Sequence, residues 1–280
     1  MLKTRVITAL VLLAVLLPVL YSQSLIAFGV VAGIFLAAAM WECMRLFKRG
    51  QGVPAAILWS LGFAAWVQAQ LMQVQINGLA LFALCVLSWT LCFVPMLKLG
   101  LPKLRSRWDR LVSVLYMVSI FACFIAMIEL FRHSTMYLLS VLMLVWAADS
   151  GAYFVGRAIG KRKLAPSISP GKSWEGAIGG WIAVLLLATV SLSVPTLHDT
   201  FAVHVYQQLG VPGGALVMSL MVAASVVGDL AESQLKRRAG IKDSSQLLPG
   251  HGGVLDRIDA LVPVLPLAAL ITTLMSPNPF

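Results

Sequence analysis

The densest run of polar side chains in the chain closes an apolar segment long enough to span a membrane. Asp229, Glu232, Ser233 and Lys236 follow one another at spacings of three and four residues, so a helix places them on one face. A helix end that extends its charges into water would account for Lys236. It does not account for the two acids before it, because an ionised carboxylate inside a span costs on the order of 3 kcal/mol. We therefore expect a functional role for Asp229.

A glycine-rich stretch leads into the next apolar segment. His251, Gly252 and Gly253 precede Asp256 and Asp259, which stand three residues apart. Acids at a helix start can simply cap its N–H groups. The glycines add backbone N–H groups that can approach an anion, while both aspartates can direct oxygen ligands to the same place. Because magnesium prefers such oxygen ligands beside phosphate, the pattern predicts a magnesium site.

A third polar patch begins at Asp149 and continues through a basic loop that contains Ser169, Lys172 and Ser173. The Gly-Lys-Ser triplet in this loop is typical of a Walker A phosphate loop, but that motif requires glycine at position 166, which is proline, and a preceding strand, which we do not expect. A Ser/Gly/Lys loop before a helix still suits phosphate. The alternative is a basic loop in which Ser173 only caps the following helix.

The run from Ser233 to Asp259 resembles the signature of the phosphatidate cytidylyltransferases, also called CDP-diacylglycerol synthases. The matching residues are Ser233, Leu235, Lys236, Arg237, Lys242, Asp243, Ser245, Leu248, Pro249, His251, Gly252, Gly253, Val254, Asp256, Arg257, Ile258 and Asp259. Two further segments, 149–154 and 169–176, are similar to the same family. The first 130 residues or so match it only as hydrophobic helices.

The resemblance implies the reaction of CTP with phosphatidic acid to give CDP-diacylglycerol and pyrophosphate. It also implies a divalent metal, Mg²⁺, at Asp229 and Asp256, with Lys236 and Arg237 beside them as the other catalytic residues. Asp259 fits the motif as a third metal ligand. The remaining substrate-binding candidates are Ser233, Lys242, Asp243, His251, Gly252, Gly253, Ser169, Lys172, Ser173 and Asp149.

This chemistry explains the charges. A phosphomonoester is largely dianionic at neutral pH and needs no strong base to attack. The obstacle is repulsion from the triphosphate, so catalysis requires positioning and cations. We expect Lys236, Arg237 and Lys242 to cover that charge beside the metal, and the Lys172 loop to contact the triphosphate or pyrophosphate.

The elements that position these residues are apolar segments, and the chain is predicted to be an all-α, polytopic integral membrane protein. About nine spans are expected, at residues 6–22, 25–41, 54–72, 78–97, 111–131, 137–158, 177–195, 213–232 and 259–276. The first lacks a small-x-small cleavage site and is expected to be retained. We divide the chain into N-terminal helices, 1–135, for packing or dimer contacts, and a catalytic region, 136–280.

The basic residues predict the orientation. With the N-terminus in the cytoplasm, all of the 21 Lys and Arg residues except Arg132 fall on the cytoplasmic side. Both polar loops that carry chemistry, 159–176 and 237–258, then face the cytoplasm, and the predicted location is a bacterial inner membrane. The outer 196–212 loop carries no Lys or Arg.

Composition excludes several classes of protein. The 280 residues are 60% hydrophobic and 11% charged, which excludes a soluble or disordered chain. We attribute the net charge of +10 to topology and anionic substrates and expect no nucleic acid. An outer interfacial pair explains Glu129 and Arg132. The four cysteines, Cys43, Cys85, Cys92 and Cys123, are expected to pack in the core or face lipid.

Two other functions remain open. One is a CTP-dependent lipid kinase of the polyprenol or dolichol type, and the other is an ion-coupled transporter that uses Asp149 and Asp229. The expected partners are CTP, phosphatidic acid and membrane lipids. A homodimer and a second cation beside the magnesium are left open.

Overall fold

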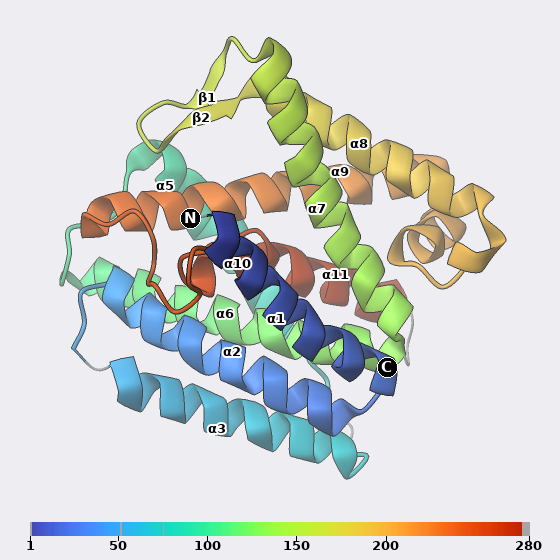
Figure 1. The fold of residues 1–280 in the computed structure, drawn as a ribbon, viewed down its shortest axis with the longest axis horizontal. Coiled ribbons are helices and arrows are strands. Elements are labelled where there is room, and N and C mark those ends of the chain that lie inside the picture. Colours follow the sequence, from blue (N-terminus) through green and yellow to red (C-terminus); the bar gives the residue numbers. More distant parts are fainter. Residues whose placement is uncertain (1, 51, 75, 276–280) are drawn as a thin grey trace.

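The computed structural model describes residues 2–50, 52–74 and 76–275, apart from the side chains at positions 2, 3 and 5. The last residues of the predicted catalytic region, 276–280, lie outside this description. The elements in chain order are α1 (Leu2–Ser22), α2 (Leu25–Leu46), α3 (Gly52–Leu71), α4 (Leu79–Ser88), the π-helix η1 (Trp89–Phe93), α5 (Val94–Leu99), α6 (Arg107–His133), α7 (Thr135–Ile159), β1 (Lys163–Ala165), β2 (Ser169–Ser173), α8 (Trp174–Ser193), the 3₁₀ helix η2 (Pro195–Leu197), α9 (Phe201–Ala239), α10 (Leu255–Ile258) and α11 (Leu261–Met275). Figure 1 shows a helical bundle with one small hairpin, which confirms the all-α class.

Seven helical stretches in the described part of the chain are long and apolar enough to cross a membrane. One of them joins α4, η1 and α5 into a continuous stretch, Leu79–Leu99. The first and last predicted spans correspond to shorter apolar helices, Val6–Ser22 and Leu261–Met275. The polytopic architecture is therefore confirmed, whereas the count of nine spans stays a prediction.

Serine residues begin several of these helices. Ser24, Ser106, Ser134 and Ser173 each accept a hydrogen bond from the backbone N–H three residues later. Such caps satisfy N–H groups that have no partner within the helix. Ser173, the last residue of β2, caps α8, so the capping contact given as the alternative for this residue is present.

Glycines bring α7 and α8 into close contact. A Cβ atom at Gly180 would lie 2.4 Å from the carbonyl oxygen of Ala148, and one at Gly176 would lie 2.7 Å from that of Ala152. Only glycine allows such an approach of two backbones, and small residues are common at contacts between membrane helices. This packing fixes the start of α8, and therefore the hairpin before it, against the end of α7.

The predicted N-terminal and catalytic regions share one hydrophobic core. Helix α11 packs against α6 and α4 as well as α9. Cys43, Cys85 and Cys123 are buried in this core and Cys92 is partly exposed, all as free thiols, which confirms the packing role predicted for them. The division into two functional regions stays a prediction.

A buried carboxylate connects the ends of three helices. Asp109, at the start of α6, accepts a hydrogen bond of 2.7 Å from Arg238 at the end of α9, and Arg49 after α2 lies 3.5 Å from its other oxygen. Arg238 also donates to the carbonyl oxygen of Pro102. These contacts hold the last turn of α9 in place, next to the residues with the candidate chemistry.

Two segments differ from the predictions. The expectation of no strand before the Gly-Lys-Ser triplet is wrong, because β1 and β2 form a short antiparallel hairpin there. Pro166 in its turn still excludes a Walker A loop. The 196–212 loop is also shorter than predicted, because helical structure resumes at Phe201 and bends at Gly210, which has φ of 67°.

Candidate active site

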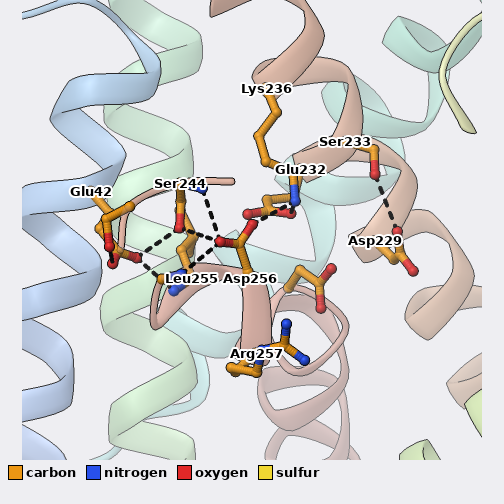
Figure 2. Close-up of polar contacts among 12 residues, drawn as sticks. Glu42, Asp229, Glu232, Ser233, Lys236, Ser244, Leu255, Asp256 and Arg257 are labelled. Atoms are coloured by element: carbon orange, nitrogen blue, oxygen red, sulfur yellow. Dashed lines mark hydrogen bonds and ion pairs between the residues drawn. The ribbon is translucent and has the colours of Figure 1, made fainter. Parts of the chain in front are cut away.

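The last turns of α9 present the predicted polar face. Ser233 donates to Asp229 over 3.3 Å, and Lys236 forms an ion pair with Glu232 four residues before it. Glu232 is fully buried. Figure 2 shows the Lys236 side chain extending to the carboxylates of Glu232 and Asp256. The predicted sharing of one helix face is confirmed.

Asp256 is the point where the glycine-rich segment meets α9. Its Oδ1 lies 2.7 Å from the Nζ atom of Lys236. Its Oδ2 accepts three hydrogen bonds of 2.8–2.9 Å, from the N–H and hydroxyl of Ser244 and from the N–H of Gly253. Burial alone would raise the pKa of Asp256, but the hydrogen bonds from Lys236, Gly253 and Ser244 outweigh it and hold the pKa below its usual range.

The glycines allow the backbone of this segment to lie close to the Asp256 carboxylate. The Gly253 N–H, which we expected to face an anionic ligand, donates to Asp256 instead. Gly252 has φ of 82°, and a Cβ atom there would lie 2.8 Å from the Asp256 carboxylate. The anion that this glycine-rich turn surrounds is therefore the Asp256 carboxylate of the protein itself.

A carboxylate from the N-terminal region holds the same segment. Glu42 on α2 is fully buried and accepts hydrogen bonds from the hydroxyls of Ser244 and Ser245 and from the N–H groups of Val254 and Leu255. Glu42 is not among the predicted site residues, because the predicted second span ends at residue 41. The available signal was a single acid at the end of an otherwise apolar helix.

A cavity of about 520 Å³ lies between α7, the hairpin, α8 and α9. Its lining includes five of the predicted site residues: Asp149, Ser169, Lys172, Ser173 and Asp229. The Nζ atom of Lys172 lies 2.6 Å from Oδ2 of Asp229. The first and third polar patches of the sequence therefore meet, since the hairpin places Lys172 beside Asp229 on α9.

The other candidates lie in the last turn of α9, on the loop that follows it, and between α10 and α11. Arg237, Lys242 and Asp243 are exposed, while His251 is partly buried and its carbonyl oxygen accepts a hydrogen bond from Arg257. Asp259 lies between α10 and α11, and its carbonyl oxygen is in close contact with Gly228, next to Asp229.

Each of the two acids predicted to hold magnesium is paired with a lysine: Asp229 with Lys172, and Asp256 with Lys236. These two and Asp259 supply the hard oxygen donors that magnesium prefers, which fits a metal held by one or two carboxylates together with substrate oxygens. They do not form a compact three-ligand group.

Within the described residues, the one group of three His, Cys, Asp or Glu side chains with ligand atoms within 4.8 Å of one another is His133, Asp199 and His204. It joins the end of α6 to the start of α9, in the outer part of the predicted topology. Asp199 accepts hydrogen bonds from Ser134 and contacts His133 at 3.2 Å, so these residues connect helix ends. Nearby, Arg132 donates to Glu129 over 3.0 Å, which confirms that predicted pair.

A model of the cytidylyltransferase family matches residues 3–275, almost the whole chain. The chain belongs to the cytidylyltransferase family. Membership makes it a nucleotidyltransferase, an enzyme that moves a cytidylyl group. The cavity and the paired lysines and aspartates are thus the candidate active site of a cytidylyltransferase.

Relatives of this cytidylyltransferase cover nearly its full length. A phosphatidate cytidylyltransferase from Pseudomonas aeruginosa is 39% identical, over 97% of each chain. One from Haemophilus influenzae is 38% identical over 95% of this chain and 96% of its own. One from Staphylococcus aureus is 34% identical over 96% and 98%. The N-terminal helices, which carry Glu42, are therefore part of the shared protein.

Proposed function

We propose that the protein is a phosphatidate cytidylyltransferase that makes CDP-diacylglycerol and pyrophosphate from CTP and phosphatidic acid. The observation that carries this proposal is the cavity in which Lys172 meets Asp229 at the ends of spanning helices, beside the Lys236–Asp256 pair. Full-length relatives carry the name of this activity. The site combines cations for phosphates with a position at the end of a membrane bundle.

The reaction requires little proton chemistry. An oxygen of the lipid phosphate attacks the α-phosphorus of CTP and forms a new P–O bond. The bond between the α-phosphorus and the bridging oxygen breaks, and its electron pair leaves with pyrophosphate. Since the attacking phosphate is already largely dianionic, the enzyme needs to overcome repulsion and to align two charged substrates.

The lysines are suited to that task. Lys172 and Lys236 now contact carboxylates, and each has a flexible stem that lets its ammonium group turn to a phosphate oxygen. Lys172 belongs to the cavity and would contact the triphosphate, whereas Lys236 lies closer to the glycine-rich segment. Exposed Arg237 and Lys242 would add to the positive potential around the departing pyrophosphate.

Asp229 and Asp256, with Asp259 nearby, would hold a magnesium ion. When bound, the ion supplies charge neutralisation of the phosphates and polarises the α-phosphoryl group. If Lys172 and Lys236 turned to substrate phosphates, the carboxylates that they now contact would be free to hold the ion. A second cation would add further neutralisation.

We infer that this site faces the cytoplasm of a bacterial inner membrane, with the N-terminus on the same side. The support is the distribution of Lys and Arg, since Arg49, Arg238 and the basic hairpin belong to one side and Arg132 to the other. CTP is a cytoplasmic nucleotide. The lipid head group would enter from the membrane surface while its acyl chains stay in lipid.

The two other functions lack comparable support. The relatives carry transferase names, and neither a CTP-dependent lipid kinase nor an ion-coupled transporter is among the matches reported above. A homodimer would be compatible with either the transferase or the kinase and does not decide between them.

The proposal is tested with purified protein in detergent or proteoliposomes supplied with CTP, phosphatidic acid and magnesium. We expect a CDP-lipid and pyrophosphate in equal amounts, and no product when any one of the three is omitted. Ion flux into proteoliposomes without CTP, and no CDP-lipid in the full mixture, would contradict it.

A further inference from the structure

Glu42 lies outside the cavity and outside every motif that the reaction explains. It belongs to α2, more than 200 positions before the residues it contacts, and its side chain has no exposed surface. We infer that Glu42 is a positioning residue for cytidylyl transfer, which holds the glycine-rich segment so that Asp256 is presented to Lys236. This inference rests on the proposed function.

Three consecutive backbone N–H groups donate to two carboxylates, those of Asp256 and Glu42. The N–H of Gly253 donates to Asp256 over 2.8 Å. The next two, from Val254 and Leu255, donate to the two oxygens of Glu42 over 3.0 and 2.7 Å. Helix α10 starts here without a side-chain cap of its own, so Glu42 satisfies N–H groups that would otherwise lack partners. The direction of the turn before Asp256 is thus set by α2.

Ser244 joins the two carboxylates directly. Its hydroxyl lies 3.0 Å from Oε2 of Glu42 and 2.9 Å from Oδ2 of Asp256, and its N–H donates to the same Asp256 oxygen. Figure 2 shows Ser244 between Glu42 and Asp256, with Lys236 on the far side. Loss of the Glu42 carboxylate would therefore remove a contact that fixes Ser244, which supplies two of the four donors to Asp256.

Close packing around Gly253 leaves no room for a larger residue between the turn and Glu42. A Cβ atom at Gly253 would lie 2.0 Å from the Ser244 hydroxyl and 2.5 Å from Glu42, so the glycine is needed for the carboxylate to reach the turn.

A glutamine at position 42 keeps the size of the side chain but offers one acceptor oxygen, with an amide group facing the remaining donors. The second contact would become a clash of two donors.

The chain offers a matched control in Glu129 on α6. This glutamate is also buried, and it accepts hydrogen bonds from Trp66, Gln70 and Arg132 at 2.7–3.0 Å, but it lies in the outer part of the predicted topology. Glu129→Gln removes a buried, hydrogen-bonded carboxylate as Glu42→Gln does. It leaves the segment around Asp256 untouched.

The experiment compares wild type, Glu42→Gln and Glu129→Gln in the CTP and phosphatidic acid assay across a magnesium titration. We expect both variants to unfold at lower temperature in detergent. Only Glu42→Gln should lower kcat, by about ten- to a hundredfold, and raise the magnesium concentration for half-maximal activity, because partners that orient ligands have effects of that size. Glu42→Asp, which keeps the charge, should recover part of the activity.

Hydrogen exchange gives a readout that does not depend on activity. The amide hydrogens of residues 244–255 should exchange faster in Glu42→Gln than in wild type. In Glu129→Gln their exchange rates should equal those of the wild type. If Glu42→Gln cannot be purified, Ser245→Ala, which removes one donor to Glu42, should show a smaller change of the same kind. The inference would be overturned if Glu42→Gln had the activity, magnesium dependence and exchange rates of the wild type. It would also be overturned if Glu129→Gln lost as much activity as Glu42→Gln. If wild type makes no CDP-lipid but exchange changes as expected, the proposed function fails while the hold of Glu42 on the segment stands.

Discussion

At the scale of single residues, the site is a set of carboxylates that are each held by a cation or by several donors. Lys172 pairs with Asp229, and Lys236 bridges Glu232 and Asp256. The spacing along α9 could be predicted because helix geometry is local. The Lys236–Asp256 pair could not be derived from spacing, since the two residues are 20 positions apart and most of the chain between them is irregular. Glu42 was missed for the same reason, because its role exists only once α2 packs beside a distant segment.

Asp229→Asn and Asp256→Asn are expected to lower kcat about a hundredfold or more, since each would remove a negative oxygen ligand of the proposed magnesium ion. Incorporation of labelled CTP into lipid measures the effect. Asp199→Asn, in the cluster with His133 and His204, is the control and should retain activity. Near-normal turnover in either site variant would contradict the assignment.

Lys172→Ala is expected to raise the KM for CTP about tenfold or more, because a charged hydrogen bond contributes on the order of 1.5–3 kcal/mol. Steady-state kinetics with varied CTP measures it. Lys163→Ala, an exposed lysine on the same hairpin outside the cavity lining, should leave the KM unchanged. Unchanged KM and kcat in Lys172→Ala would remove the hairpin from the site.

At the scale of elements, hydropathy located the helices well and described the connections poorly. A span needs only length and apolar composition, which the sequence displays directly. The hairpin of β1 and β2 is rich in Pro, Gly and Lys, residues with low strand propensity, and it forms because α7 and α8 bring its ends together. The bend at Gly210 looked like a loop, although helical structure continues on both sides.

The close contact of α7 and α8 gives a prediction at this scale. Gly180→Ala would place a methyl group 2.4 Å from the carbonyl oxygen of Ala148, and we expect destabilisation of about 1–3 kcal/mol from overpacking, with lower activity as the cavity walls separate. Gly62→Ala on α3 meets its nearest neighbour, Phe121, at an ordinary 3.7 Å and should change stability by no more than about 1 kcal/mol. Thermal unfolding in detergent measures both, and equal stability of the two variants would contradict the packing account.

At the scale of the whole molecule, the described part of the chain forms one bundle of seven membrane-length helices and two shorter apolar ones, and the candidate active site lies toward one end of it. Asp109 ties α6 to α9 and the segment after α2 at that end, while Glu129 and His133 lie at the other end of α6. The asymmetry in Lys and Arg predicts from the sequence that both polar loops lie on one side of the membrane, and that orientation stays a prediction. The way the N-terminal helices support the catalytic end through α2 could not be predicted, since it depends on helix packing.

Orientation is tested by cysteine labelling in a background without the four native cysteines. A cysteine at Ser167, exposed between β1 and β2, should react with a membrane-impermeant maleimide in inside-out vesicles and not in intact cells. A cysteine at Thr196, exposed at η2, should show the reverse. The opposite pattern would mean that the site does not face the cytoplasm.

The most direct test of cytidylyl transfer follows the two ends of CTP separately. Purified protein with phosphatidic acid and magnesium receives CTP labelled with ³²P at either the α- or the γ-phosphorus. For cytidylyl transfer, we expect the α-label to enter the lipid product and the γ-label to appear in pyrophosphate. Entry of the γ-label into lipid, with release of CDP, would show a kinase and contradict the proposed function.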